Sequence, residues 1–335
     1  MKLPAGKVPS KILEEIVFNY LGAKLREVTV GPAHGLDGAV IEVGNKSLVT
    51  SMDPITGALE RIGWLAVNIN ANDVATFGVK PAFFSSCLLL PENSTNETVE
   101  TICKQINLGA KKLGVAVTGG HAETTPNLQF PVIVGCCMGV TDKGQYVTAR
   151  GAKTGNRLIL TKSAGIEGTA ILATDKNIQL KRELGSSTLE KAERFFRQVS
   201  IVEEAILAFQ TGHVTAMHDP TEGGVAGGLH ELADASNLGF KVYEEKIYVA
   251  EETLRICEYF QVDPLQLIAS GSLLIAAEKD YANNVVELLK KNRITAAIIG
   301  ELLPTPAKRL MLLKGGGAKA LARPKADHLW QALKK

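Results

Sequence analysis

Hydrophobic positions follow two patterns along the first half of the chain, one with helical spacing and one made of short apolar runs. Apolar residues three and four positions apart predict helices over residues 10–21, 57–77 and 95–113, and each segment is followed by a glycine. Short runs rich in valine, isoleucine and leucine predict strands near Val28 and over residues 39–43, 48–53, 81–90, 115–120 and 129–140.

The same two patterns continue after residue 157. Helical spacing recurs over residues 165–175, 187–212, 222–236, 250–260 and 280–291. Strands are expected over residues 157–161, 214–217, 239–243, 272–277, 294–302 and 308–313, whereas GGGAKA (315–320) is expected to be a loop. Between the halves lies TDKGQYVTARGAKTGNR, which is polar and rich in glycine. We therefore predict a boundary near residue 150, with one domain over 1–150 and another over 151–335.

The order of the predicted elements indicates the fold class. Helices and strands do not alternate strictly, as they would in a doubly wound parallel sheet. The sequence therefore predicts an α+β fold with mixed or antiparallel sheets. A length of 335 residues is sufficient for two domains of ordinary size.

Composition excludes several classes of protein. The chain is 45% hydrophobic and 21% charged, with a formal net charge of +2 and no long basic run, so nucleic acid is not an expected partner. No apolar run approaches the length of a membrane span, and MKLPAGKVPSKILEE has no apolar core typical of a signal peptide. The five cysteines have no metal-binding spacing. These features predict a cytoplasmic protein that does not contact membranes.

The stretch HDPTEGGVAGGLHELADAS (218–236) carries the first chemical signal. Asp219, Pro220 and Glu222 fit a capping box at the start of a helix. Capping does not explain the pairs Gly223-Gly224 and Gly227-Gly228, since each glycine inside a helix costs about 1 kcal/mol relative to alanine. Glycine suits a close approach of another backbone or of a ligand. Acids beside glycine amides would suit Mg²⁺ carrying a nucleotide phosphate. A capped helix and a Mg-nucleotide site both remain open.

Further acidic residues recur at predicted strand ends and helix starts. Asp37 lies in GLDGAV, Asp53 ends the predicted strand LVTSMD, and Glu123 follows His121 in TGGHAET. Each of these acids alone is explained by a turn or a cap. Asp73 differs because its neighbours are apolar, so its charge needs a partner or a metal ion. Spacing cannot show whether these acids meet in space. The chain has no Walker A, GxGxxG, HExxH, CxxC or GxSxG motif.

Five of these stretches occur in the order and approximate spacing found in one known superfamily. They are GLDGAV, SMDPI, NANDVATFGVKP, TGGHAETTP and HDPTEGGVAGGLHELA. Together they resemble the superfamily of aminoimidazole ribonucleotide (AIR) synthase. That superfamily includes the hydrogenase-maturation protein HypE, selenophosphate synthetase, thiamine-monophosphate kinase and formylglycinamidine ribonucleotide synthetase. The HDPTEGG form of the last motif and the C-terminal half of the chain resemble HypE most.

The resemblance implies a fold and a set of site residues. The N-terminal domain would form a β-barrel with a second chain in a homodimer, and ATP would bind in a cleft beside the C-terminal α+β domain. Mg²⁺ would be held by acids, and phosphates by glycine amides and a flexible arm carrying Lys7. The residues implied are Asp37, Asp53, Asp73, Glu123, Asp219 and Glu222 for the metal, Lys7, Asp37, Asp53, Asp73, Gly119, Gly120, Gly223 and Gly224 for the nucleotide, and His218 or His121 for proton transfer.

Two departures from the family pattern stand out. His121 occupies a position that is acidic in many members, and Glu123 would replace that acid from the same side of a strand. HypE carries a reactive C-terminal cysteine, whereas this sequence ends ADHLWQALKK and its last cysteine is Cys257. His213 and His230 are expected to be surface or capping groups.

Three functions follow as hypotheses. The first is a Mg-ATP-dependent enzyme of the HypE and AIR synthase type. It would activate an amide, carbonyl or similar oxygen of a small-molecule or protein-borne substrate, and other maturation proteins would be its partners. The second is a small-molecule kinase of the thiamine-monophosphate kinase type. The third is a nucleotide-binding scaffold with little catalysis.

Overall fold

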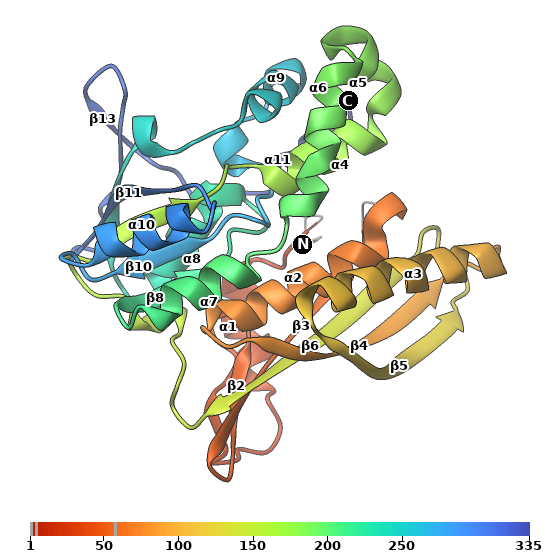
Figure 1. Ribbon diagram of the computed structural model, residues 1–335, viewed down its shortest axis with the longest axis horizontal. Coiled ribbons are helices and arrows are strands. Elements are labelled where there is room, and N and C mark those ends of the chain that lie inside the picture. The colour runs from red at the N-terminus through yellow and green to blue at the C-terminus, as the bar shows by residue number, and fades with distance from the viewer. Residues whose placement is uncertain (1–2, 4–5, 57–58) are drawn as a thin grey trace. The chain divides into compact units, whose positions relative to one another are not determined.

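The computed structural model describes residues 3, 6–56 and 59–335 (Figure 1). The chain divides into two compact units. The small unit comprises Leu25–Gly31 and Asp37–Tyr146, and the large unit comprises Met1–Lys24, Pro32–Leu36 and Val147–Lys335. The N-terminal segment thus groups with the C-terminal half of the chain.

The small unit is built on a six-stranded sheet with the order β1-β2-β3-β6-β4-β5. Neighbouring strands are antiparallel except β4 and β5, which are parallel. The strands are β1 (Val28–Val30), β2 (Ala39–Val43), β3 (Lys46–Ile55), β4 (Pro81–Leu90), β5 (Ala116–Thr124) and β6 (Val132–Asp142).

Two helices, α2 (Ile62–Thr76) and α3 (Asn96–Leu113), cover one face of this sheet (Figure 1). Helix α2 is buried on nearly all sides, between the sheet and α3. Helix α3 is amphipathic; it begins at the N-cap Thr95 and ends at Gly114, whose φ of 69° is readily adopted only by glycine. The first two residues of the helix predicted over 57–77 lie outside the described residues, and the helix proper begins at Ile62.

The large unit is built on a seven-stranded sheet with the order β13-β12-β9-β11-β7-β10-β8. Its strands are antiparallel except the pair β9 and β12. The strands are β7 (Arg157–Thr161), β8 (Val214–His218), β9 (Gly239–Tyr243), β10 (Leu274–Ala277), β11 (Ala296–Leu303), β12 (Arg309–Leu312) and β13 (Ala318–Ala320).

Helices pack around this second sheet, and α8 joins its strands in one hydrophobic core. The α-helices are α1 (Ser10–Glu15), α4 (Ile166–Asp175), α5 (Asn177–Leu184), α6 (Ser186–Glu193), α7 (Val202–Gln210), α8 (Gly224–Ala235), α9 (Glu251–Phe260), α10 (Ala282–Lys291) and α11 (His328–Leu333). Among the described residues, no helix combines the length and apolar character that a membrane span requires. The predicted α+β fold with mixed sheets is confirmed.

Several predicted elements differ from those observed. The helix predicted over 187–212 is broken into α6, a 3₁₀ helix over Arg194–Gln198, and α7. The break occurs where the Lys162 ammonium binds the carbonyl oxygens of Gln198 and Ser200 at 2.9 and 2.6 Å, which occupies groups that a continuous helix would use. The N-terminal helix is also shorter than predicted, since α1 ends at Glu15 and only a 3₁₀ turn over Val17–Asn19 follows.

Candidate functional site

Two of the predicted acids meet at one serine in the small unit. Ser51 Oγ on β3 lies 2.8 Å from the carbonyl oxygen of Asp37 and 2.6 Å from carboxylate Oδ2 of Asp73. The Asp73 side chain is buried on α2, so a serine hydroxyl meets the requirement for a polar partner. Residues on three separate parts of the chain are thus brought together.

Asp53 belongs to the same region of the small unit. It lies two residues after Ser51, so both side chains face the same side of β3. Its backbone N–H donates to Asn70 Oδ1 at 2.8 Å, and Asn70 Nδ2 donates to its carbonyl oxygen at 3.2 Å. The prediction that Asp53 ends the strand is wrong, because β3 continues to Ile55. Hard oxygen donors of this kind suit Mg²⁺.

His121 and Glu123 lie in β5, at the edge of the same sheet. Their side chains are exposed, and His121 Nε2 lies 3.2 Å from Glu123 Oε2, as expected for residues on one side of a strand. Strands β6 and β4 separate β5 from β3, which places the two strands roughly 14 Å apart at about 4.8 Å per strand. The pair therefore forms a group separate from Ser51 and its acids.

The glycines before His121 have conformational roles. Gly119 and Gly120 have φ values of 140° and 150°, which residues with a side chain rarely adopt. A Cβ on Gly120 would lie 1.9 Å from the carbonyl oxygen of Ser86, so close pairing of β5 with β4 requires glycine there.

In the large unit, the start of α8 differs from the predicted capping box. The helix begins at Gly224, with Gly223 as a left-handed N-cap, so neither Asp219 nor Glu222 caps it. The N–H of Gly223 donates to Asp327 Oδ2 at 2.6 Å. Positive φ values at both glycines delay the helix beyond Glu222, and an aspartate distant in sequence takes over the capping role.

The chain's own atoms approach three of the four glycines in this stretch. A Cβ on Gly224 would lie 2.5 Å from the carbonyl oxygen of Leu267, and one on Gly228 would lie 2.8 Å from Pro220 Cβ. A Cβ on Gly227 would lie 3.0 Å from the carbonyl oxygen of Glu222. The sequence left open whether these glycines admit a ligand or another part of the chain. Close packing against the chain's own atoms accounts for these three glycines.

His218 and Asp219 lie at the end of β8, and both are buried. His218 Nε2 lies 3.0 Å from Oε2 of Glu231 on α8, so the histidine is hydrogen-bonded at a strand end. Burial raises the pKa of Glu231, but the charge of Lys7 and the hydrogen bond from His218 outweigh it. The pKa of Glu231 therefore lies below its usual value, and the carboxylate is ionised at neutral pH.

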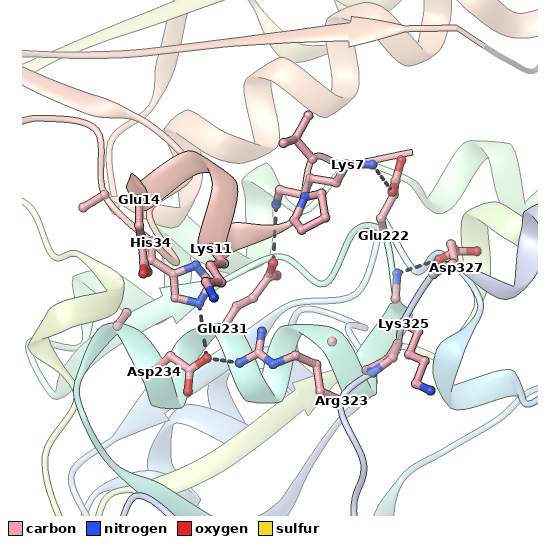
Figure 2. Close-up of a pocket in the computed structure, with 18 of the residues that line it drawn as sticks. Lys7, Lys11, Glu14, His34, Glu222, Glu231, Asp234, Arg323, Lys325 and Asp327 are labelled. Carbon is pink, nitrogen blue, oxygen red and sulfur yellow. Dashed lines mark hydrogen bonds and ion pairs between the residues drawn. The ribbon is translucent and has the colours of Figure 1, made fainter. Parts of the chain in front are cut away.

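Lys7 joins the same group of side chains (Figure 2). Its backbone N–H donates to Glu222 Oε2 at 2.8 Å, and its Nζ lies 3.4 Å from Glu231 Oε1. The neighbouring Gly6 has a φ of 96°, and a Cβ there would lie 2.6 Å from Glu222 Oε2. The N-terminal segment is thus held against α8 by backbone and side-chain contacts.

These residues open onto a cavity of about 860 Å³ that follows α8 within the large unit (Figure 2). Besides Lys7, Glu222 and Gly223, it is lined by ionisable residues that the sequence analysis did not identify. They are Lys11, Glu14, His34, Arg150, Glu231, Asp234, Arg309, Arg323, Lys325 and Asp327. One signal was available, because Glu231 and Asp234 follow Gly227 at helical spacing and mark a polar stripe on α8.

Asp234 gathers three cationic or polar groups at one end of this cavity. Arg309 Nη2 lies 2.7 Å from its Oδ1, while Arg323 Nη2 and His34 Nε2 both contact Oδ2. Burial and the charge of Arg323 lower the pKa of His34, so its ring is neutral at pH 7.

Two buried side chains of the large unit bear on the sequence predictions. His230 was expected at the surface or at a cap, but it is buried, with Nε2 2.9 Å from the carbonyl oxygen of Leu321. Its place on the apolar side of α8, against Phe240, explains the error.

Cys257 is buried in α9, and burial raises its thiol pKa to about 12, so this thiol is not available as a reactive carrier.

Comparison with known proteins identifies relatives along most of the chain. Residues 35–141 match the family model described as AIR synthase related protein, N-terminal domain, and residues 153–312 match the corresponding C-terminal domain. The chain is 30% identical over 301 residues to a putative hydrogenase expression/formation protein of Methanocaldococcus jannaschii, covering 87% of each chain. It is 27% identical over 278 residues to the carbamoyl dehydratase HypE of Bradyrhizobium diazoefficiens, covering 80% of this chain and 78% of the relative.

Solved structures show the same fold. A HypE–HypF complex matches with a TM-score of 0.78 and 24% identity, covering 93% of this chain and 99% of the other. A HypE structure in complex with ATP matches with a TM-score of 0.73 and 20% identity, covering 98% of both chains.

Proposed function

The chain belongs to the AIR synthase related family, and from this membership we propose that it is an ATP-dependent enzyme that phosphorylates and thereby activates an amide, carbonyl or similar oxygen. Relatives named carbamoyl dehydratase and hydrogenase expression/formation protein favour an amide oxygen and a role in hydrogenase maturation. The substrate is then a small molecule or a group carried by a partner maturation protein. The expected homodimer and cytoplasmic location belong to this proposal.

The observation that carries the proposal is the meeting of Asp37 and Asp73 at Ser51. Asp73 is a buried carboxylate, the backbone of a second acidic residue, Asp37, meets it at Ser51, and a third acid, Asp53, lies on the same strand as Ser51. Burial of a charged group is costly, so this arrangement favours a functional role. Its oxygen donors fit Mg²⁺, which would neutralise charge on the phosphates of ATP during transfer.

The proposal assigns roles to residues of each unit. The proposed magnesium ligands of the small unit are Asp37, Asp53 and Asp73. Those of the large unit are Asp219 and Glu222. Glu123 and His121, on the exposed strand β5, are assigned to a further metal position and to proton transfer.

Other residues bind phosphate or move a proton. Lys7 contributes positive charge, and the amides of Gly119, Gly120, Gly223 and Gly224 are assigned to phosphate oxygens. For Gly223 and Gly224 this requires phosphate to replace the Asp327 carboxylate and the Thr221 carbonyl oxygen, which accept these two N–H groups in the structure. Because His218 Nε2 donates to the ionised Glu231, proton exchange at His218 is assigned to Nδ1. Glu231 then acts by orienting the imidazole ring.

The test is Mg²⁺-dependent binding of ATP followed by a screen for ADP, AMP and phosphate. Asp219→Asn keeps the size of the side chain but removes its charge, so we expect turnover to fall about 100-fold or more while the fold is retained. Asp280→Asn, at an exposed position before α10, is the matched control and should leave turnover unchanged.

The products also separate the alternatives. A phosphorylated acceptor that keeps its phosphate would identify a small-molecule kinase of the thiamine-monophosphate kinase type, and AMP would indicate a selenophosphate-type reaction. A rise in melting temperature with ATP but no turnover with any candidate partner would indicate a nucleotide-binding scaffold. ATP turnover that needs no metal and survives replacement of all four aspartates would contradict the proposal.

A further inference from the structure

The cavity along α8 has two chemically different ends. At the start of the helix it is lined by Glu222, Gly223 and Asp327, close to the residues assigned to phosphoryl transfer. At the other end it is lined by Asp234, Arg309 and Arg150. Gly224 and Asp234 are about ten residues apart on α8, which corresponds to roughly 15 Å at 1.5 Å per residue. The cavity is therefore long enough for an extended small molecule, and its volume of about 860 Å³ lies in the range of small-molecule sites.

The acids that line the cavity near the start and the middle of α8 already have partners within the large unit. Glu222 accepts the Lys7 N–H, and Glu231 accepts from His218 and faces the Lys7 ammonium. The two carboxylate oxygens of Asp327 accept the N–H groups of Gly223 and Leu329. Each of these carboxylates thus accepts at least one hydrogen bond from the large unit itself.

Positive charge exceeds negative charge at the far end. Arg309 and Arg323 share the single carboxylate of Asp234, and His34 beside them is neutral. Arg150 lines the same end, because the hydrogen bond from Ser236 Oγ to the Ala149 carbonyl oxygen (2.7 Å) holds its segment beside the last turn of α8. Three guanidinium groups therefore lie with two carboxylates, Asp234 and Glu14, at this end, since the nearby Glu231 is paired with Lys7.

The arginines differ in how many of their donors are used. Each of the three guanidinium nitrogens of Arg309 donates a hydrogen bond. Nε donates to the Pro306 carbonyl oxygen, Nη1 to the His230 carbonyl oxygen, and Nη2 to Asp234. Arg323 is held by Asp234 through Nη2, and its side chain is 42% exposed. Arg150 is exposed. Arg323 and Arg150 thus have donors that can reach a ligand in the cavity, and guanidinium groups bind carboxylate and phosphate in a bidentate manner.

We propose that the arginine end of this cavity binds the oxyanion group, carboxylate or phosphate, of the acceptor substrate. Arg150 and Arg323 are its ligands, and the Asp234–Arg309 pair positions Arg323. This inference rests on the proposed function and adds that the acceptor is an elongated anionic small molecule whose reactive oxygen points toward Glu222. The anionic group and the reactive group would then lie at opposite ends of the ligand.

The test is calorimetric titration of the full chain with inorganic phosphate and, separately, with glutarate, each with and without Mg-ATP. Arg150→Gln and Arg323→Gln should each weaken anion binding about 10-fold to 100-fold, since each removes a charge-assisted pair of hydrogen bonds. Arg323→Lys keeps the charge but not the planar fork and should give an intermediate loss. Arg182→Gln, on the exposed face of α5, is the matched control and should bind as the wild type does.

The outcomes separate this inference from the proposed function. Arginine-dependent binding of phosphate alone, or of glutarate alone, supports the site and identifies the class of anion. If Mg-ATP does not bind but anions still bind through the arginines, only the proposed function fails. If neither anion binds the wild type at millimolar concentration, if both glutamine variants bind normally, or if the same variants weaken Mg-ATP binding equally, the inference is overturned.

Discussion

At the scale of single residues, buried His230 makes the stability of the large unit depend on pH. Burial lowers the pKa of His230 to about 4, whereas the unfolded chain titrates near the ordinary value of 6.5. Below pH 6.5 the unfolded state therefore binds a proton that the folded state does not, and the free energy of unfolding falls as pH decreases toward 4. We expect this histidine to remove at most about 2 kcal/mol between pH 6.5 and 5.

His230→Gln tests this expectation, because glutamine can donate to the Leu321 carbonyl oxygen without titrating. Urea unfolding at pH 7, 6 and 5 should give a smaller pH dependence for the variant than for the wild type. Asp327 contributes in the opposite direction, since burial raises its pKa to about 6, but it is present in both proteins and cancels in the difference. His213→Gln, at a partly exposed histidine, is the control. Parallel curves for the wild type and His230→Gln would contradict the argument.

At the scale of elements, the start of α8 depends on a backbone that only glycine allows. Gly224 has a φ of 61°, and a Cβ there would lie 2.5 and 2.7 Å from the carbonyl oxygens of Leu267 and Leu265. Gly224→Ala combines left-handed strain with a clash against fixed backbone, so we expect the free energy of unfolding to fall by about 3 kcal/mol or more.

Gly212→Ala is the matched control for this prediction. Gly212 also has a positive φ, of 76°, but no atom lies within 4 Å of the position of its Cβ. Only the conformational strain of about 1 kcal/mol should then be lost. Equal losses for the two variants in urea unfolding would show that the contacts with Leu265 and Leu267 carry no weight.

Local signals predicted most of the elements, and the exceptions depend on contacts that are distant in sequence. Strand β4 matches the predicted range 81–90, and α3 begins at Thr95 and ends at Gly114 as its capping residues indicate. The elements α5 and α11 were not predicted, and the prediction that GGGAKA (315–320) is a loop is wrong at its end, where β13 forms. Strand β13 is only Ala318–Ala320 and forms by pairing with β12, and α11 is a short helix whose N-cap, Asp327, also binds Gly223.

The candidate site was predictable in residue type but not in geometry. The motifs named Asp37 and Asp73, but the hydroxyl that joins them belongs to Ser51, which lies in the SMDPI motif and was not predicted to be a site residue. Glu231 was likewise missed, because on α8 it resembles an ordinary exposed glutamate until the fold places His218 and Lys7 beside it. Sequence spacing shows which acids are present, whereas only the packing of β3 against α2 and of β8 against α8 shows which of them meet.

At the scale of the whole molecule, one face of the small unit's sheet has no helix of that unit packed on it among the described residues. Helices α2 and α3 pack on the other face, and the uncovered face exposes large apolar side chains, with Met52 63% exposed, Val140 45% and Phe83 41%. A contiguous apolar face of this kind is typical of an interface between protein chains. It supports the proposal that two copies pair through this sheet, as the family resemblance implies.

Phe83→Asp tests this pairing by placing a charge on the uncovered face. A buried charge without a partner is unfavourable in an interface, so we expect dimer dissociation to increase about 10-fold or more in sedimentation velocity experiments. Ile178→Asp, on a residue of α5 that is 90% exposed, introduces the same charge in the large unit and should leave association unchanged. The proposal of a dimer through this face fails if the wild type is monomeric at micromolar concentration, or if Phe83→Asp associates as the wild type does. Since the carboxylates of Asp53 and Asp73 lie on the side of the sheet that faces α2, the variant should also retain Mg²⁺-dependent ATP binding unless that binding requires the second copy.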